Sequence, residues 1–523
     1  MFKRLLSVGG FTLLSRITGF IRDILMASVL GKGALSDAFL VAFRFPNYFR
    51  AIFGEGTINP AFLPRYAAFR AKGEHEAAAR FGDQVFAWQI AIQAVLLIGA
   101  LAAMPYIVRV IAPGFSDHPG QLALATTLSR ITFPYLILTV VVVQLSAMLN
   151  ANEKFWAAAA WSNFLNLAMI GTILAAAWFP NAAYAAACGV LIGGVIELAF
   201  MLWASARHGL RLRFHWPRWT PEIREFFFAV GAVTFGTASV TVSPFVDTII
   251  ASFLPAGSLT ALYYADRINQ LPLGVLGIAL GTVLLPEMST RLARGDVAGS
   301  DAAQNRAAAF GLLLTLPFLA VFLTVPATIM SAIFAHGAFD RSAAELSAVA
   351  LSAYGVGLPA MVLVRIVSST FYARHDTATP AKATVTSIVA NVAIKVILVC
   401  GFHLGIAGIA LGTAIGAWVN VGALTWFSRR RGFLNVQPVL RRALFPILLA
   451  ALAAGLGAIA GVDLAEQFPV SCRLDFWVFH VPAATLQVEA ALGMAALLGC
   501  AGYGAVALAF RRQLPLGRFA RKQ

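Results

Sequence analysis

The chain has 523 residues, of which 59% are hydrophobic and only 12% are charged. An average soluble domain carries roughly 25% charged residues, so this composition excludes a soluble multi-domain protein and indicates that lipid surrounds most of the chain. The net charge of +16 would also suit a nucleic-acid-binding protein, but membrane proteins collect Lys and Arg in their cytoplasmic loops, which explains most of this excess.

Fourteen apolar runs follow one another, each long enough to span a bilayer, which takes roughly 20 residues. They lie at about 5–31, 35–56, 83–112, 122–150, 155–179, 183–206, 225–254, 259–290, 306–335, 345–373, 380–402, 405–428, 441–461 and 488–510. The first run follows Lys3 and Arg4 as a signal sequence would, but Arg16 and Arg22 interrupt it, so we expect a retained helix. The sequence therefore predicts an all-α polytopic membrane protein of about fourteen transmembrane helices.

Basic residues are distributed unevenly over the loops between these runs. The loops after the second, sixth, eighth, tenth and twelfth runs and the C-terminal tail hold most of them. The alternate loops hold almost none, only Lys32, Arg341 and Arg473. By the positive-inside rule this asymmetry places both termini in the cytoplasm and requires an even number of helices.

The chain also contains a weak internal repeat. Residues 8–64 align with 230–286, so that Asp23 matches Asp247, Gly33 matches Gly257, and Pro46 matches Pro272. Because six helices separate the copies, they run parallel and are related by an axis along the membrane normal. This predicts two pseudo-symmetric six-helix lobes, 1–220 and 221–432, followed by a C-terminal helix pair with a basic tail, 433–523. Chance similarity between Ala- and Gly-rich helices is the alternative.

Ionisable side chains inside the apolar runs are the most informative feature. A charge at the centre of a membrane helix costs roughly 2.5–3.5 kcal/mol on insertion scales, so such residues should face a wet cavity or a partner. They concentrate in the first two helices and at the matching part of the second lobe. The polar and charged residues concerned are Ser15, Arg16, Arg22, Asp23, Asp37, Arg44, Asn47, Arg50, Asp266, Arg267 and Arg365.

Three explanations for these arginines compete. Arg22, Arg44 and Arg50 could extend to the headgroups from helix ends, and Arg22 or Arg267 could form a structural pair with a nearby carboxylate. Neither alternative explains the concentration of arginines, whereas a shared cationic cavity does. Because an Arg fork binds phosphate bidentately and stays charged at every working pH, the preferred substrate should be an anion such as a phosphate or pyrophosphate.

The chain shows no enzymatic motif. It contains no G-x-x-x-x-G-K-[ST], H-E-x-x-H, G-x-S-x-G or dinucleotide fingerprint, and its four cysteines have no metal-ligand spacing. We therefore expect a transporter without enzymatic activity, disulfide, metal or cofactor, driven by an ion gradient, the membrane potential or the gradient of the substrate itself.

Three segments resemble one known family. Residues 15–66, SRITGFIRDILMASVLGKGALSDAFLVAFRFPNYFRAIFGEGTINPAFLPRY, closely resemble the start of MurJ/MviN proteins, the lipid II flippases of the MOP exporter superfamily. YYADRINQLPLGVLGIALGTVLLP (263–286) and FYARHDTATP (371–380) resemble the eighth and the tenth-to-eleventh helix segments of that family. The similarity extends over essentially the whole chain.

The resemblance implies a flippase of the bacterial inner membrane that serves peptidoglycan synthesis and cell shape. Two lobes would enclose a central cavity, and the last two helices would form a groove for the lipid tail. The substrate would be lipid II, the undecaprenyl-pyrophosphate-linked peptidoglycan precursor, carried to the periplasmic leaflet by alternating access, possible partners being the cell-wall synthesis machinery. The implied site residues are Arg16, Arg22, Arg50 and Arg267 at the pyrophosphate, Asp37, Asn47 and Glu55 as functionally sensitive positions, and Ser15 and Asp23 along the first helix.

The chain departs from the family pattern at three places. Gln270 stands where some relatives carry an acid, and Arg365 replaces a Lys, which changes the geometry of the donors. Sodium-binding members use an acid on the seventh helix with an Asn and a second acid on the eleventh. Asp247 and Asn391 fit that pattern, but Lys395 stands where the second acid is expected, so we predict an Asp247–Lys395 ion pair in place of bound sodium.

Three other functions are compatible with the architecture. A MATE-like drug/cation antiporter would need a cavity rich in carboxylates, whereas these helices carry more Arg than Asp and Glu. A flippase for another polyprenyl-linked saccharide would share the phosphate chemistry. A membrane scaffold would not need intramembrane arginines, so replacing Arg16 or Arg267 by alanine would leave its function unchanged.

Overall fold

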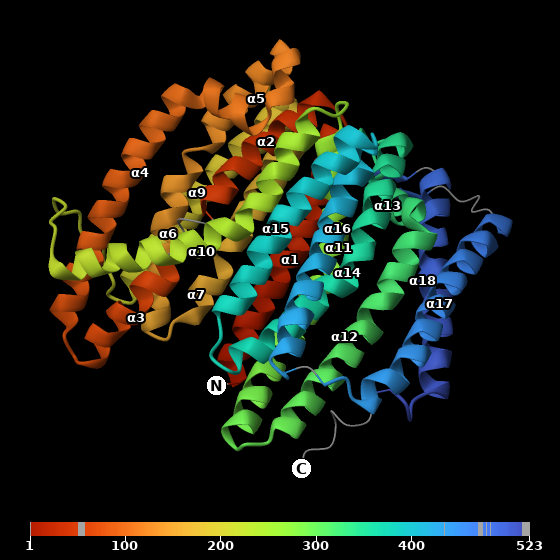
Figure 1. Cartoon of the computed structure of the whole chain (residues 1–523). Coiled ribbons are helices and arrows are strands. Elements are labelled where there is room, and N and C mark those ends of the chain that lie inside the picture. Colours follow the sequence, from red (N-terminus) through yellow and green to blue (C-terminus); the bar gives the residue numbers. More distant parts are fainter. Residues whose placement is uncertain are drawn as a thin grey trace. The chain divides into compact units, whose positions relative to one another are not determined.

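The computed structural model describes residues 2–50, 58–433, 435–468, 474–476, 479–481 and 483–514, and nearly all of them are helical (Figure 1). The chain divides into two compact units, Met1–Thr260 and Ala261–Gln523. Helices of the first unit are α1 (Phe2–Leu30), α2 (Ala34–Phe49), α3 (Ile58–Ala71), α4 (His75–Ile111), α5 (Pro119–Thr132), α6 (Tyr135–Ala151), α7 (Phe155–Ala160), α8 (Ser162–Leu174), α9 (Ala182–Arg207) and α10 (Pro221–Ser252), with 3-10 turns η2 (Pro113–Asp117) and η3 (Ala176–Trp178).

The second unit takes up almost all of α11 (Ser258–Ala293), whose first residues belong to the first unit. The remaining elements are α12 (Val297–Thr324), α13 (Pro326–Phe334), α14 (Arg341–Tyr372), α15 (Ala378–Val396), the π-turn η4 (Ile397–Gly401), α16 (Gly405–Arg430), α17 (Pro438–Gln467), β1 (Leu474–Phe476), β2 (Phe479–Val481) and α18 (Ala483–Ala509). The two strands pair antiparallel, with Leu474 opposite Val481, in a segment that the sequence predicted only as a loop.

Each of the fourteen predicted runs overlaps one helix or consecutive helices of the residues that the structure describes. Lipid offers no partner to backbone N–H and C=O groups, so a long apolar run must satisfy them within its own helix. Ten helical segments of the described residues are long and apolar enough to cross a membrane. The remaining predicted spans correspond to α1, α2, α10 and α11, which carry the repeat. The all-α membrane fold is therefore confirmed, and the number fourteen stays a prediction.

The boundary between the units falls one helix later than the predicted lobe boundary at 220/221. The start of α10 explains this difference, because it packs its aromatic side chains against α4. Phe226 lies edge-on to Phe81, with ring centroids 6.3 Å apart, and Phe227 lies edge-on to Trp88 at 5.9 Å. The three-part division at 220/221 and 432/433 stays a prediction.

Small residues bring the helices of each unit close together. In the first unit, a Cβ on Gly193 of α9 would lie 2.9 Å from the Cα of Leu165 in α8. In the second unit, α17 and α18 lie side by side (Figure 1), and a Cβ on Gly461 would lie 2.5 Å from the backbone N of Ala495. The pair also packs on α12, where Gly455 faces Ala320. The C-terminal helix pair is thus built into the second unit.

Candidate functional site

A polar cluster joins α1 to α8 in the first unit, and Asn166 of α8 is at its centre. The Asn166 amide nitrogen donates to the carbonyl of Ser15 at 3.1 Å and to Thr18 Oγ1 at 3.2 Å. Its amide oxygen accepts a hydrogen bond of 2.9 Å from Arg22 Nη1. Ser162 of α8 also donates to the hydroxyl of Ser15 at 3.1 Å. One α8 amide therefore fixes the face of α1 that carries Ser15 and Arg22.

Arg22 also forms an ion pair with its sequence neighbour Asp23. Arg22 Nη2 lies 2.7 Å from Asp23 Oδ1, Nε lies 3.1 Å from the same oxygen, and both residues are buried. The guanidinium also lies over the ring of Phe43 at 5.5 Å. These contacts match the structural-pair explanation for Arg22. Breaking a buried pair from one side costs about 3–5 kcal/mol, because it leaves a buried charge uncompensated.

Arg16 has a different environment from Arg22 and Asp23 on the same helix. Its side chain is exposed, and it makes no ion pair with any residue that the structure describes. The seven-residue spacing of Arg16 and Asp23 predicts that they share one face of α1, yet Asp23 is buried against Arg22 while Arg16 is exposed. The guanidinium of Arg16 is therefore available to bind an anion.

Asp37 near the start of α2 is bonded to the start of α11. Its carboxyl oxygens accept hydrogen bonds from the backbone N–H of Gly257 at 2.6 Å, the N–H of Thr260 at 2.9 Å and the Thr260 hydroxyl at 2.6 Å. The first N–H groups of a helix have no partner within the helix. Asp37 satisfies them from another helix, so it acts as an N-cap supplied in trans, and it is only 2% exposed.

The turns beside this cap are equivalent in the repeat and touch each other. Gly33, after α1, has φ 149°, and Gly257, after α10, has φ 94°, both in the region that favours glycine. A Cβ on Gly257 would collide with the side chain of Lys32. The positive-inside rule predicts that both turns lie on the periplasmic side. Asp37 therefore joins α2 to the second copy of the repeat at the predicted periplasmic end.

Further along, α2 remains bonded to α10. Arg44 Nη1 donates to Thr248 Oγ1 at 3.2 Å, and the Tyr48 hydroxyl donates to the carbonyl of Pro244 at 3.0 Å. Arg50 follows at the end of α2, half-buried, with Nε donating to Asn47 Oδ1 at 3.3 Å. These contacts bring Arg44, Asn47 and Arg50 to one end of α2.

Glu55, the remaining candidate of this region, lies outside the described residues.

In the second unit, Arg267 lies on the ring of Tyr263 in α11. Its guanidinium carbon is 4.9 Å from the ring centroid, and Nη2 donates to the Tyr263 hydroxyl at 2.9 Å. Gln270, one of the departures from the family pattern, donates its amide N–H to Asp266. Arg365 of α14 is exposed and makes no ion pair within the described part of the chain. Arg16 and Arg365 thus present the two most accessible guanidinium groups among the candidates.

The ion-coupling candidates Asn391 and Lys395 lie one turn apart on α15 and face glycines of α16. The Asn391 amide donates to the carbonyl of Gly412 at 3.1 Å, and a Cβ on Gly416 would lie 2.7 Å from the Cβ of Asn391. A Cβ on Gly412 would collide with the Lys395 side chain, which is fully buried. An alternative to the predicted ion pair with Asp247 is that Lys395 extends to a membrane interface; its burial argues against this, and the ion pair itself stays a prediction.

Sequence reasoning missed three residues that organise the site: Asn166, Thr248 and Thr260. Each is a small polar residue within or beside a predicted apolar run, and Thr248 and Thr260 are fully buried. Buried polar groups are almost always hydrogen-bonded, so an amide or hydroxyl inside a span is a signal for a polar partner on another helix. That signal identifies the residue but not the partner.

The comparisons with known proteins agree with this picture. A family model described as "Lipid II flippase MurJ" matches residues 26–472. A probable lipid II flippase MurJ of Rhizobium tropici is 37% identical over 461 residues, covering 87% of this chain and 85% of the relative. The lipid II flippase MurJ of Burkholderia cenocepacia is 31% identical over 465 residues, covering 86% and 88%.

Two solved structures show a similar fold. A lipid II flippase MurJ in an inward closed conformation matches with a TM-score of 0.78 at 23% identity, covering 97% of this chain and 99% of that one. An inward-facing MATE family multidrug transporter of the MOP superfamily matches with a TM-score of 0.65 at 16% identity, covering 80% and 94%. At these identities the likeness concerns the fold alone.

Proposed function

The chain belongs to the lipid II flippase MurJ family, and from this premise we propose that it carries lipid II from the cytoplasmic to the periplasmic leaflet by alternating access. The observation that carries the proposal is the 37% identity to a probable lipid II flippase over 87% of the chain. The chain is a multi-pass membrane protein, and we place it in the inner membrane with both termini in the cytoplasm. No covalent step is required, since the substrate changes leaflet without changing its bonds.

The arginines are assigned to the pyrophosphate of the substrate at successive stages of transport. Arg16 and Arg365 support this assignment directly, because their guanidinium groups are exposed and make no ion pair within the described residues. A planar fork with several N–H donors matches a phosphate oxygen pair, and such charge-assisted bonds are roughly twice as strong as neutral ones. Arg50 donates to Asn47, and Arg267 donates to the hydroxyl of Tyr263 and lies on its ring. We assign both to the phosphate oxygens because their positions resemble those of the cavity arginines of the family.

Arg22 has a different role in this proposal. Its guanidinium is already bonded to Asp23 and Asn166, so a phosphate would have to replace one of these acceptors. We assign it to positioning: the Arg22–Asp23–Asn166 cluster holds α1 against α8 and so fixes the direction in which Arg16 points. Ser15 supports the same packing through its carbonyl and hydroxyl.

Asp37 is proposed as a latch on the predicted periplasmic side. Alternating access requires each side of the transporter to open in turn. The three hydrogen bonds from Gly257 and Thr260 to Asp37 tie α2 to the start of α11, so they must break or rearrange when that side opens. One carboxyl group thus sets part of the free-energy difference between closed and open states.

The test is depletion and replacement in a bacterial host. The host flippase is depleted while this chain, or a variant, is expressed, and lipid-linked precursors are assayed for the leaflet in which they reside. We expect the chain to restore periplasmic lipid II and Arg16→Ala to fail although the protein accumulates in the membrane. Lys at position 16 should restore only part of the activity, because an ammonium lacks the planar fork.

The same assay separates the alternatives. Accumulation of a different polyprenyl-linked saccharide in the cytoplasmic leaflet, with lipid II unaffected, would change the substrate but retain the class. Full activity of Arg16→Ala and Arg267→Ala would refute the phosphate assignment and favour a scaffold. A MATE-like antiporter would instead give drug efflux without precursor movement, and the arginines of these helices argue against it because organic cations are held by carboxylates.

A further inference from the structure

The linker that joins α9 to α10 is fastened to the surface of α4. The backbone N–H of Arg213 donates to Asp83 Oδ1 at 2.8 Å, and that of Arg218 donates to Gln84 Oε1 at 2.8 Å. In return, Trp88 Nε1 donates to the carbonyl of Arg218 at 3.1 Å. Because these α4 residues occupy successive turns, the linker follows a fixed path across α4 and positions the side chains that it carries.

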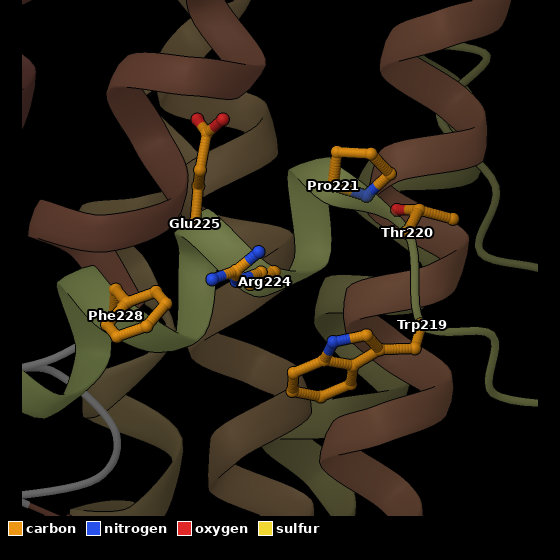
Figure 2. Close-up of a pocket in the computed structure, with 6 residues that line it drawn as sticks. All are labelled: Trp219, Thr220, Pro221, Arg224, Glu225 and Phe228. Carbon is orange, nitrogen blue, oxygen red and sulfur yellow. The ribbon is translucent and has the colours of Figure 1, made fainter.

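A pocket lies where this linker enters α10, and Figure 2 shows Arg224 between Trp219 and Phe228. Trp219 forms a rigid wall, since it stacks on Phe227 with centroids 5.4 Å apart and lies edge-on to Trp88 at the same distance. The lining residues are Trp219, Thr220, Pro221, Arg224, Glu225 and Phe228.

The pocket lining carries one basic residue, Arg224, and one acidic residue, Glu225. Arg224 is exposed, and its guanidinium lies over the ring of Phe228, 5.7 Å from the centroid. Glu225, the acid in the pocket lining, forms an ion pair with Arg65 of α3. The pocket therefore offers one accessible guanidinium, and the exposed linker residues Arg213 and Arg218 add to the positive field around it.

Large aromatic side chains are exposed around Arg224. Trp216 is 83% exposed, Phe228 69% and Trp219 60%. Trp and Arg are characteristic of the boundary between hydrocarbon and water, and the positive-inside rule places this loop on the cytoplasmic side. The cytoplasmic leaflet carries anionic lipids, which attract basic groups close to the membrane surface.

We propose that this pocket, here called the α10 pocket, binds one anionic phospholipid of the cytoplasmic leaflet. The phosphodiester would accept hydrogen bonds from Arg224, and the glycerol and upper acyl chain would lie along Trp219 and Phe228. A free phosphate would leave both aromatic side chains without contact. An acidic peptide would place polar groups against these aromatic side chains at the membrane boundary, where an acyl chain fits better. Binding there would hold the start of α10, and with it the link between the two copies of the repeat, to the cytoplasmic surface. This lipid site does not depend on the identity of the transported substrate.

The experiment uses the full chain, purified in a neutral detergent. Short-chain phosphatidylglycerol is titrated below its micellar concentration, with short-chain phosphatidylcholine and inorganic phosphate as comparison ligands, and bound lipid is counted by native mass spectrometry. We expect saturable binding of one phosphatidylglycerol in preference to phosphatidylcholine. Arg224→Gln should weaken this binding by about tenfold or more, since a hydrogen bond to a charged group is lost. Phe228→Ala should weaken it by about fivefold through lost apolar contact.

The matched control is Arg441→Gln. Arg441 is also exposed and also stands three residues after the first proline of a helix on the predicted cytoplasmic side, in α17. We expect its binding curve to stay within twofold of the parent. An equal loss in Arg441→Gln would show a general effect of surface charge and overturn the proposal. Equal binding of phosphatidylcholine, or full competition by inorganic phosphate alone, would also overturn it.

Discussion

Asp37→Asn tests the latch most directly. The carboxyl group of Asp37 accepts bonds of 2.6 and 2.9 Å from Thr260 on one oxygen and a bond of 2.6 Å from Gly257 on the other. An amide retains one acceptor oxygen, which can keep the Thr260 bonds, but its NH2 group would face the N–H of Gly257. The loss is one hydrogen bond to a charged group, about 1.5–3 kcal/mol. We take about 2 kcal/mol, which corresponds to a roughly 30-fold change in the ratio of closed to open states.

The assay is cysteine labelling beside the latch. In a background without the native cysteines, Ser258→Cys provides a buried thiol, since Ser258 is only 3% exposed. A membrane-impermeant maleimide should label it about 30-fold faster once Asp37 is replaced by Asn, if opening precedes labelling. Asp340→Asn is the matched control, because Asp340 caps its own helix, α14, through the N–H of Ala343 at 2.8 Å. A labelling rate within twofold of the parent in Asp37→Asn, or an equal rise with Asp340→Asn, would refute the latch.

Three further outcomes follow from the same geometry. Arg22→Ala should lower the free energy of unfolding in detergent by about 3–5 kcal/mol, because it removes one side of the buried Arg22–Asp23 ion pair, whereas Arg16→Ala should leave the thermal midpoint unchanged and abolish complementation. Asp376, in the loop before α15, has its pKa lowered, chiefly by the Thr379 hydroxyl and then by other contacts including Arg431. A carboxylate whose pKa is lowered by folding stabilises the folded state above its unfolded pKa of about 4, and this stabilisation is lost as the pH falls through the folded pKa. In Asp376→Asn the free energy of unfolding should therefore fall less on acidification than in the parent. Flipping in proteoliposomes should persist without sodium and fall when the membrane potential is collapsed, since each charge moved is worth about 2.3 kcal/mol per 100 mV.

A different result would contradict each of these predictions. An unfolding midpoint for Arg22→Ala equal to that of Arg16→Ala would show that the buried pair contributes nothing. If the acidic part of the stability–pH curve is the same in Asp376→Asn as in the parent, other carboxylates cause the loss of stability in acid. A strict sodium requirement would show that Lys395 has not replaced a bound cation.

The helices themselves were predictable because lipid leaves the backbone no alternative to intrahelical bonding. The candidate α1 residues were also found from sequence, because a charge in an apolar run has few explanations. What the sequence could not supply was the partner. Asn166 lies 144 positions from Arg22, and helical periodicity gives the face of one helix without identifying the helix that covers it.

The partners of Asp37 could not be predicted from the sequence for a different reason. The resemblance gave it as a sensitive position, and its charge suggested a place beside an arginine. Its partners in the structure are instead the backbone N–H groups of Gly257 and Thr260 and one hydroxyl. Backbone donors occur at every helix start, so no side-chain pattern could mark this one as the acceptor of a bond from α2.

The repeat explains why only one of its two copies supplies the carboxyl group of the proposed latch. With the offset that pairs Gly33 with Gly257, Asp37 corresponds to Ala261, whose side chain carries no acceptor. Gly33, the N-cap residue of α2, has no side chain to accept a capping hydrogen bond. Asp37 of the first copy thus caps the second copy, and the equivalent residue of the second copy cannot return the bond. A single carboxyl group can therefore release the contact.

The same offset separates the two acids of the repeat. Asp23 has Arg22 beside it as a buried counter-charge, whereas Asp247 follows Val246, which can supply none. A carboxylate within a span is costly without a cation, so the second copy must obtain its counter-charge from outside its own turn. Lys395 is fully buried and stands where sodium-binding relatives carry an acid, which makes its ammonium the candidate. On this argument the first copy holds its charge pair within one helix as a fixed brace. The predicted Asp247–Lys395 pair would instead join two helices, and a pair shared between helices can change during transport.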